Sequence, residues 1–233
     1  MKTYKNSDPL KILAFDTSTE YCSTALHLDD GHLLKKDIRA ERRHSELLLP
    51  MIKDMLDEAE LSLSDLDGLA FGAGPGSFTG LRIACGVAQG LAFATQLPVI
   101  GISTLEAIAQ QNKHDRTIVA MDARMGEIYL AAYIRQNASW YPVVKPKLCK
   151  PDEATVLTDA GWIGCGSGFD VYPEELQAVY HKNLSEIYYR QYPHAQEIAH
   201  LAAMCPSEAY VTDPAQAAPI YIRNKVALKE SER

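Results

Sequence analysis

Strand-like and helix-like segments follow one another in the same order twice along this chain, and that recurrence constrains the fold more than any other feature. In the first half, hydrophobic periodicity predicts the order βββαβα, with strands at 11–18, 21–28, 33–40, 66–72 and 98–103 and helices at 41–60, 77–96 and 104–111. The second half repeats this order loosely, with strands at 117–123, 127–134, 139–148 and 161–166 and helices at 151–157, 173–179 and 193–204. We therefore predict an α/β protein with a duplicated fold of two βββαβα-type halves.

The same repeat predicts how the 233 residues divide into domains. Residues 1–10 are expected to form a short N-terminal overhang, and 11–112 a first subdomain. Residues 113–233 form a second subdomain, whose final helix packs back on the first. Within 41–60, Pro50 interrupts an apolar pattern with helical spacing, which predicts either a kink or a late start of that helix.

The net charge of −7 at pH 7 argues against a protein that binds nucleic acid by itself, because phosphates are neutralised by a basic surface. The five cysteines lack CxxC spacing, which favours reduced thiols over a disulfide framework. The N-terminal stretch has no apolar core of a signal peptide, and no apolar run reaches the roughly 18 residues of a membrane span. We therefore expect a cytoplasmic protein with no membrane contact.

The stretch GAGPGSFTG, residues 72–80, holds four glycines and a proline directly before a predicted helix. Such a loop lets backbone approach something closely, either a phosphate at the helix N-terminus or another stretch of protein. It lacks both the lysine of a P-loop and the pattern of a dinucleotide fingerprint. Ser77 or Thr79 is the expected N-cap. The structural residues of the loop are predicted to be Gly74, Pro75, Gly76, Ser77, Gly80 and Arg82.

The helix predicted at 77–96 is rich in small residues, namely Ala84, Gly86, Ala88, Gly90, Ala92 and Ala94. Glycine costs about 1 kcal/mol relative to alanine inside a helix, so two of them indicate that backbone approaches backbone there. Packing against the chain's own sheet and packing against a helix of another subunit both fit this composition.

Asp16 ends the first predicted strand and is followed by hydroxyl residues, a position where α/β folds hold ligands. It either contacts a metal or phosphate, or forms a turn that leads into the next strand. We take Asp16, Ser18 and Gly166, the last in a second glycine turn, as candidate nucleotide contacts. His44 has Leu48 at the position of a second metal ligand, and no nucleophile motif is recognisable. The residues therefore predict no metal site and no catalytic set.

The chain contains, in order, the stretches ILAFDTSTEYCSTAL, ERRHSELLLPMI, GAGPGSFTGLRIACGVAQGLA, PVIGISTLEAIA, MDARMGEIYLA, GCGSG and PIYIRN. This pattern resembles the TsaB (YeaZ) family of bacterial tRNA threonylcarbamoyladenosine synthesis over nearly the whole chain, with GPGSFTGLR and DARMGE as its most specific parts. The resemblance implies a duplicated actin-like, ribonuclease-H-like fold of the ASKHA superfamily. It also implies a paralogue of the catalytic subunit TsaD, whose first helix carries an HxxxH metal motif that is half absent here.

The resemblance further implies a non-catalytic subunit that binds TsaD, with the ATPase TsaE joining the assembly. tRNA meets such a subunit only through the complex, ATP or ADP and metal are bound there and not by the chain alone, and the chain alone forms a homodimer. In this family the first helix and the helix after the glycine loop form the docking surface, and the loop is mainly a tight turn. The docking residues implied here are Leu47, Leu48, Met51, Met55, Ile83, Val87, Gly90 and Leu91.

Two other functions remain open. One is an enzyme with its own activity: an actin-like ATPase, a sugar kinase or a metallopeptidase. Asp122 is the one candidate for the acid of a second phosphate loop in such an enzyme. The other is a structural homodimer without a TsaD partner. ATP turnover by the isolated protein distinguishes an enzyme from a docking subunit. Co-purification of partners from the native cell distinguishes a structural homodimer from a docking subunit.

Overall fold

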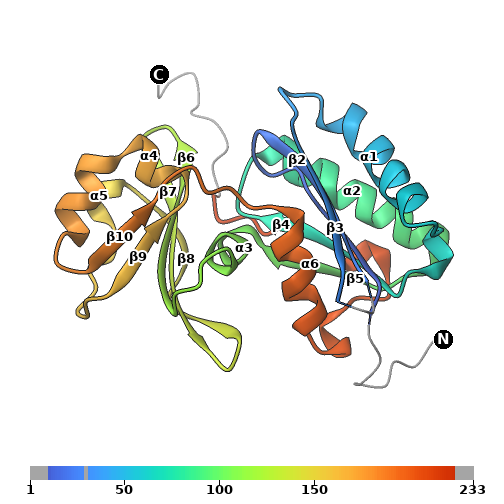
Figure 1. Cartoon of the computed structure of the whole chain (residues 1–233). Helices are drawn as coiled ribbons and strands as arrows, with labels where there is room; N and C mark the ends of the chain where they lie inside the picture. The colour runs from blue at the N-terminus through green and yellow to red at the C-terminus, as the bar shows by residue number, and fades with distance from the viewer. Residues whose placement is uncertain (1–9, 29–30, 224–233) are drawn as a thin grey trace. The chain divides into compact units, whose positions relative to one another are not determined.

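The computed structural model describes residues 10–28 and 31–223 and divides the chain into two units (Figure 1). The first unit contains the chain up to Lys113 together with Gln191–Pro219, and the second contains His114–Arg190 and the chain from Ile220. The predicted overhang at 1–10 lies outside the described residues except for its last residue.

The first unit is built on a five-stranded sheet with the strand order β3-β2-β1-β4-β5. β1 pairs antiparallel with β2 and parallel with β4. β1 and β4 are buried along their whole length, as near-continuous apolar strands covered on both faces are. The five strands are β1 (Ile12–Asp16), β2 (Tyr21–His27), β3 (Leu33–Arg39), β4 (Gly68–Gly74) and β5 (Val99–Ser103).

The sheet of the second unit repeats this topology, with the order β10-β9-β6-β7-β8. Its central strand again pairs antiparallel with the next strand of the chain and parallel with the fourth strand of the unit. The structure thus confirms the predicted α/β fold with two βββαβα-type halves. The strands are β6 (Arg116–Arg124), β7 (Glu127–Gln136), β8 (Ser139–Cys149), β9 (Trp162–Cys165) and β10 (Leu184–Tyr188).

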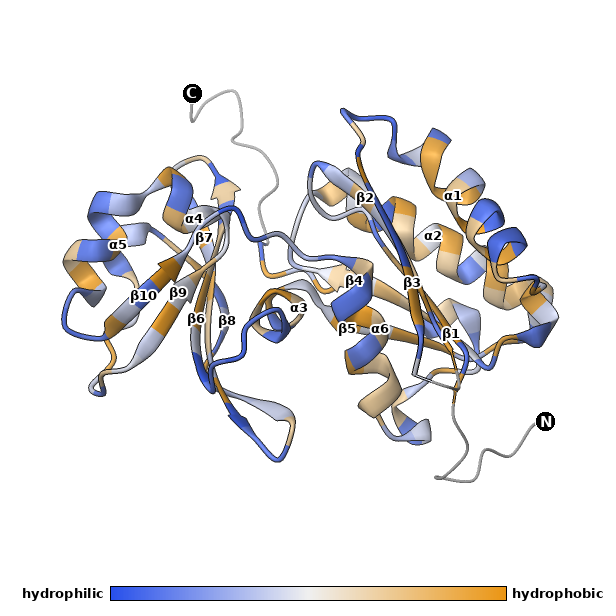
Figure 2. Ribbon diagram, in the orientation of Figure 1, coloured by the Kyte–Doolittle hydropathy of each residue, from blue (hydrophilic) through white to orange (hydrophobic). Residues whose placement is uncertain are grey.

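Helices cover both faces of the first sheet (Figure 1). α1 (His44–Glu58) and α2 (Phe78–Thr95) share a core with one face, where Leu13 and Phe15 of β1 are fully buried. In Figure 2, α1 alternates between hydrophobic and hydrophilic residues, as a helix with one buried face does. The opposite face carries α6 (Ala195–Met204), which also packs against α3 (Thr104–Gln110).

The first helix begins later than predicted and continues through its proline. Glu41 and Arg42 have φ angles of 46° and 76°, which an α-helix does not accommodate, so α1 begins at His44. Pro50 lies inside the helix, which rules out a helix that starts only at the proline.

The second unit has shorter helices, α4 (Ser167–Val171) and α5 (Pro173–Tyr180). The helix predicted at 151–157 is reduced to the 3₁₀ turn Pro151–Glu153. β10 was not predicted, because this edge strand is exposed or half-buried along its length and its sequence LSEIY shows no apolar run.

α6 follows the strands of the second unit in the chain but contacts β1, β2 and β4 of the first. The second subdomain predicted at 113–233 is therefore too large, because Gln191–Pro219 belong to the first unit. The reason is the apolar face of α6, where Ile198 and Ala199 are fully buried against that sheet and its neighbours. Within the described residues, no helix is both long and apolar enough to cross a membrane.

Candidate functional site

Glycines of the stretch 72–80, which runs from the end of β4 through the connecting loop into the first turn of α2, lie directly against other parts of the chain. A Cβ atom added at Gly80 would lie 1.8 Å from the carbonyl oxygen of Thr17, and one added at Gly76 would lie 2.7 Å from that of Ser18. At Gly72, an added Cβ would lie 1.8 Å from Oδ2 of Asp16. Real Cβ atoms do not approach other atoms this closely, so these positions have no room for a side chain.

Hydrogen bonds close the same loop over the end of β1. The Ser77 N–H donates to the carbonyl oxygen of Ser18 at 2.8 Å, and the Thr17 hydroxyl donates to the carbonyl oxygen of Gly80 at 2.7 Å. Ser77 is the N-cap of α2, and its hydroxyl accepts from the Gly80 N–H at 3.4 Å. The loop thus brings the N-terminus of α2 against residues 17–18, and the chain itself fills its concave side.

The remaining loop residues complete this turn. Gly74 has a φ of 117°, which only glycine adopts readily, and Pro75 follows it through a cis peptide bond. The Thr104 hydroxyl donates to the carbonyl oxygen of Pro75. Arg82 is exposed, and its guanidinium lies 3.7 Å from the centroid of the Phe78 ring.

The three candidate nucleotide contacts are buried by the chain itself. Asp16 is fully buried, and its Oδ1 accepts from the N–H and the hydroxyl of Ser18 at 3.0 and 2.8 Å. Ser18 is 2% exposed, and an added Cβ at Gly166 would lie 2.4 Å from the carbonyl oxygen of Ala120. Asp16 thus accepts hydrogen bonds from the turn that follows β1, and all three residues are buried in the chain.

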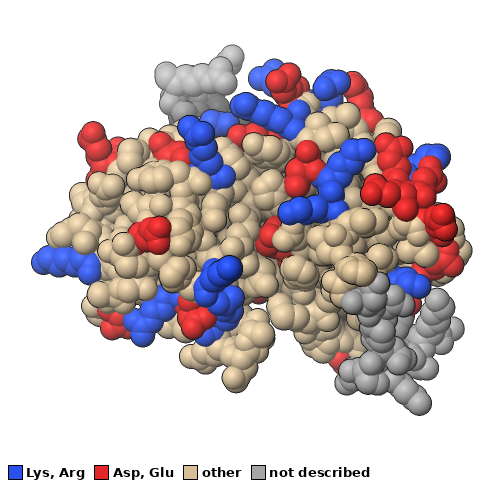
Figure 3. All heavy atoms as spheres, in the orientation of Figure 1, with Lys and Arg blue, Asp and Glu red and all other residues tan. Residues whose placement is uncertain are grey.

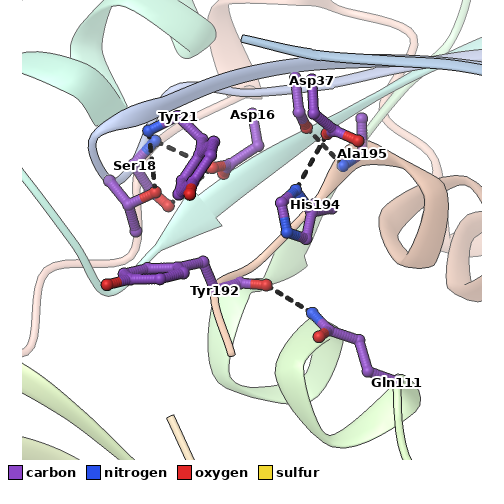
Figure 4. Close-up of polar contacts among 10 residues, drawn as sticks. Asp16, Ser18, Tyr21, Asp37, Gln111, Tyr192, His194 and Ala195 are labelled. Atoms are coloured by element: carbon purple, nitrogen blue, oxygen red, sulfur yellow. Dashed lines mark hydrogen bonds and ion pairs between the residues drawn. The ribbon is translucent and has the colours of Figure 1, made fainter. Parts of the chain in front are cut away.

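A cluster of titratable groups joins α6 to the first sheet (Figure 4). Nδ1 of His194 lies 2.9 Å from Oδ1 of Asp37 on β3, and the Ala195 N–H donates to the Ser23 hydroxyl. Burial lowers the pKa of His194, but the hydrogen bond and charge of Asp37 outweigh it and leave that pKa raised. No sequence pattern points to this pair, whose members lie far apart in the chain.

Two carboxylates in the same layer are buried with an oxygen that has no hydrogen-bond partner among the described residues. These oxygens are Oδ2 of Asp16 and Oε2 of Glu197. Burial raises the pKa of Asp16 to about 6, against the lowering effect of its hydrogen bonds from Ser18. Burial likewise raises the pKa of Glu197. The ionised forms of both groups are therefore costly in the folded chain.

Asp122 of the second unit is held by its own neighbours. Its carboxylate accepts from the Arg124 N–H at 2.9 Å and the Tyr172 hydroxyl at 3.3 Å, and it pairs with the Arg124 guanidinium at 3.1 Å. On the same β6–β7 hairpin, Glu127 pairs with Arg223. The acid considered for a second phosphate loop thus has structural partners.

Within residues 10–28 and 31–223, no group of three or more His, Cys, Asp or Glu side chains is arranged to hold a metal ion. Nε2 of His44 lies 2.9 Å from the carbonyl oxygen of Thr19, so the ring ties the start of α1 to the β1–β2 turn. Leu48, four residues on, is fully buried.

Only some residues of the expected docking surface are accessible at the surface of the chain. Leu48, Met51 and Met55 are at most 3% exposed and belong to the core, because the apolar face of α1 is directed at the sheet. The half-buried members pack at the margin of that core, and they are Leu47, Ile83, Val87 and Leu91. Two large apolar residues that were not expected there are exposed, Leu49 at 51% and Phe93 at 76%.

Two glycines within α2 face open space. A Cβ atom added at Gly86 or Gly90 would have no atom within 4 Å, other than the helix's own nearby backbone. Neither glycine has a positive φ, and both lie in the helix interior, where alanine is better by about 1 kcal/mol each. Nothing within the described part of the chain therefore requires glycine at these two positions.

The flank of α2 is fastened to the C-terminal part of the first unit. The carbonyl oxygen of Ala217 accepts from the Gln89 amide at 2.8 Å and from the Cys85 thiol at 3.3 Å. Ile83, Val87 and Leu91 pack against the core that α1 shares. The outward stripe of α2, with Gly86, Gly90 and Phe93, stays open between these contacts.

The chain matches a family model, TsaD: tRNA N6-adenosine threonylcarbamoyltransferase, over residues 38–227. It is 38% identical over 232 residues to the tRNA threonylcarbamoyladenosine biosynthesis protein TsaB of Escherichia coli (strain K12), covering 95% of this chain and 98% of that protein. The protein of that name from Haemophilus influenzae is 36% identical, covering 95% and 97%.

A solved structure agrees with these sequence relationships. YeaZ from Pseudomonas aeruginosa superposes with a TM-score of 0.83 at 39% sequence identity, covering 91% of this chain and 99% of that chain. A second structure from that organism, an uncharacterized protein with similarity to peptidase YEAZ, gives a TM-score of 0.84 at 39% identity, covering 92% and 100%. The relationship therefore extends over both units.

Proposed function

The chain belongs to the TsaB family of tRNA threonylcarbamoyladenosine biosynthesis proteins, and from this premise we propose that it is the non-catalytic partner of the transferase TsaD. In this proposal the chain docks TsaD through α1 and α2 and helps to recruit TsaE. tRNA reaches it only within that complex, in the cytoplasm. ATP or ADP and metal are bound by the complex and not by the chain alone.

The open stripe of α2 is the observation that carries this proposal. Gly86 and Gly90 lower helix stability and meet nothing within 4 Å, while Phe93 nearby exposes 76% of its surface. Helices that pack closely against one another have small residues at their crossing point. Aromatic residues are enriched at the centre of protein–protein interfaces, where binding buries them. A partner helix across this stripe accounts for all three residues.

The contacts of the other candidate residues within the chain support a subunit without its own catalytic centre. The glycine loop is filled by residues 17–18, and Asp122 has three contacts with Arg124 and Tyr172. In the absence of TsaD, the same stripe can pair with that of a second copy, since two-fold pairing brings one surface against itself.

Titration with TsaD from the same organism tests the proposal through Phe93→Asp. An unpaired carboxylate in a desolvated contact costs roughly 2–5 kcal/mol, so we expect at least a 30-fold loss of affinity with an unchanged thermal melt. Val156→Asp is the matched control, because Val156 is 73% exposed in the second unit. Equal affinity for both variants would overturn the proposed docking surface.

A further inference from the structure

Basic residues gather in one short segment of a chain that is acidic as a whole. Residues 35–43, which we call the basic segment, contain five of the 23 lysines and arginines and only two carboxylates, in a chain of net charge −7. The segment comprises the end of β3 and the turn into α1. Figure 3 shows Lys and Arg side chains in this part of the first unit, whereas Asp and Glu predominate toward the far end of α1.

Three arginines of the basic segment have no internal role that the structure shows. Arg39, Arg42 and Arg43 are exposed, and none of them makes a hydrogen bond or ion pair through its side chain within residues 10–28 and 31–223. The lysines differ, since Lys36 pairs with Asp54 at 3.5 Å. The backbone around the arginines is also unfavourable, because Glu41 and Arg42 both adopt the left-handed region.

Guanidinium groups in such a setting suit phosphates. Arginine presents a rigid fork of donors that matches phosphate oxygens in a bidentate way, and it is more weakly hydrated than lysine. The basic segment runs directly into α1, one of the two helices of the proposed docking surface, so it borders whatever that surface binds. Edge strands also carry charged residues merely to prevent aggregation, and the salt dependence of RNA binding separates the two roles.

We propose that the basic segment contacts the phosphodiester backbone of tRNA while this chain is docked on the transferase, a role that rests on the proposed function. The proposed contact is with the backbone, because most protein–nucleic acid hydrogen bonds go to phosphate and sugar and the arginine fork matches phosphate oxygens. We expect the chain alone to bind RNA weakly, since the chain as a whole has a net charge of −7.

The test compares tRNA binding by the assembled complex over a series of salt concentrations. The variants are the triple Arg39→Ala, Arg42→Ala, Arg43→Ala and the corresponding triple to lysine. A third triple, Lys145→Ala, Lys147→Ala and Lys150→Ala, removes the same charge from the β8 region. Docking of each variant on TsaD is titrated first, which keeps failure of the proposed function distinct from failure of this inference.

We expect the arginine-to-alanine triple to flatten the slope of log affinity against log salt by about 0.9 for each phosphate that is no longer neutralised. Affinity at about 100 mM salt then falls at least tenfold, while the lysine triple keeps most of the slope. Equal effects of the arginine and β8 triples would overturn the proposal, since only net charge would then matter. So would an unchanged slope, or an effect confined to docking on TsaD.

Two controls keep the result interpretable. If the alanine triple lowers the thermal melt, the exposed double Arg42→Gln, Arg43→Gln replaces it, with an expected slope change of about 1.8. If the wild-type chain fails to dock on TsaD, the proposed function is wrong. The same variants are then compared for tRNA binding by the chain alone at low salt, where an unchanged affinity of the arginine triple overturns the inference.

Discussion

The glycine loop and the middle of α2 are adjacent in the sequence and use glycine for opposite reasons. Gly72, Gly76 and Gly80 are closed in by atoms of Asp16, Thr17 and Ser18, so the fold itself excludes side chains there. Gly86 and Gly90 have open space above them. Contacts within the chain explain the first set, whereas no contact within the described residues explains the second, which the proposed docking would account for.

The largest expected effect is at the closed set, by which we mean the enclosed glycines Gly72, Gly76 and Gly80. Gly80→Ala places a methyl group 1.8 Å from the carbonyl oxygen of Thr17, and only a shift of α2 or of the β1–β2 turn relieves that overlap. We expect a loss of at least about 3 kcal/mol in the free energy of unfolding, measured by urea denaturation. A variant within about 0.5 kcal/mol of the wild type would show that the loop is not closed as described.

A second effect of the closed set concerns pH, because Gly72 leaves room for the buried carboxylate of Asp16. The pKa of Asp16 is about 6 in the folded chain and 3.8 in the reference state, so the folded state binds the proton more tightly. The stabilising contribution of this group is therefore fully present below about pH 4 and is lost as pH rises through about 6, a difference of up to about 3 kcal/mol.

Asp16→Asn removes that contribution together with the part of the raised pKa of His194 that the Asp16 charge supplies, whereas the raised pKa of Glu197 remains in both proteins. We expect the stability of the variant, measured by urea denaturation between pH 4 and 7.5, to decline less with pH than that of the wild type. Parallel pH profiles would contradict the burial of an unpaired carboxylate oxygen beside Gly72.

The smallest effect on stability is at the open set, Gly86 and Gly90, where a substitution should stabilise the chain and not destabilise it. Gly90→Ala should raise the free energy of unfolding by up to about 1 kcal/mol, because alanine is the better helix former and meets no atom within 4 Å. Thermal or urea denaturation of the isolated chain measures this. A destabilised Gly90→Ala would mean that the chain itself needs glycine there, and the contrast between the two sets would disappear.

The sequence predicted most of the fold, because the two sheets are made of segments with strong periodicity. It did not predict β10, whose residues are exposed or half-buried and form no apolar run. It predicted that the final helix packs back on the first subdomain, but not that all of Gln191–Pro219 belongs to the first unit. That assignment depends on contacts between distant parts of the chain.

The candidate site was predicted less well, because helical spacing does not separate a core face from a docking face. Leu48, Met51 and Met55 share the spacing of an amphipathic helix, and the structure places them in the core. Phe93 and Leu49 lie outside that apolar pattern, and only their exposure marks them. The sequence marks Gly86 and Gly90 as unusual residues in a helix, but only the structure shows the open space above them.

The most direct test of the docking account is a titration of Gly90→Leu with TsaD, alongside the thermal melt of the variant alone. Leucine is a good helix former, position 90 is exposed, and a Cβ atom there meets no atom of the described residues within 4 Å, so the melt should be unchanged or higher. A partner helix that crosses at Gly90 has no room for it, so affinity should fall by about 100-fold or more, a loss of roughly 3 kcal/mol. The matched control is Ala178→Leu at an exposed position of α5. A Gly90→Leu chain that binds TsaD as tightly as the wild type would contradict the account.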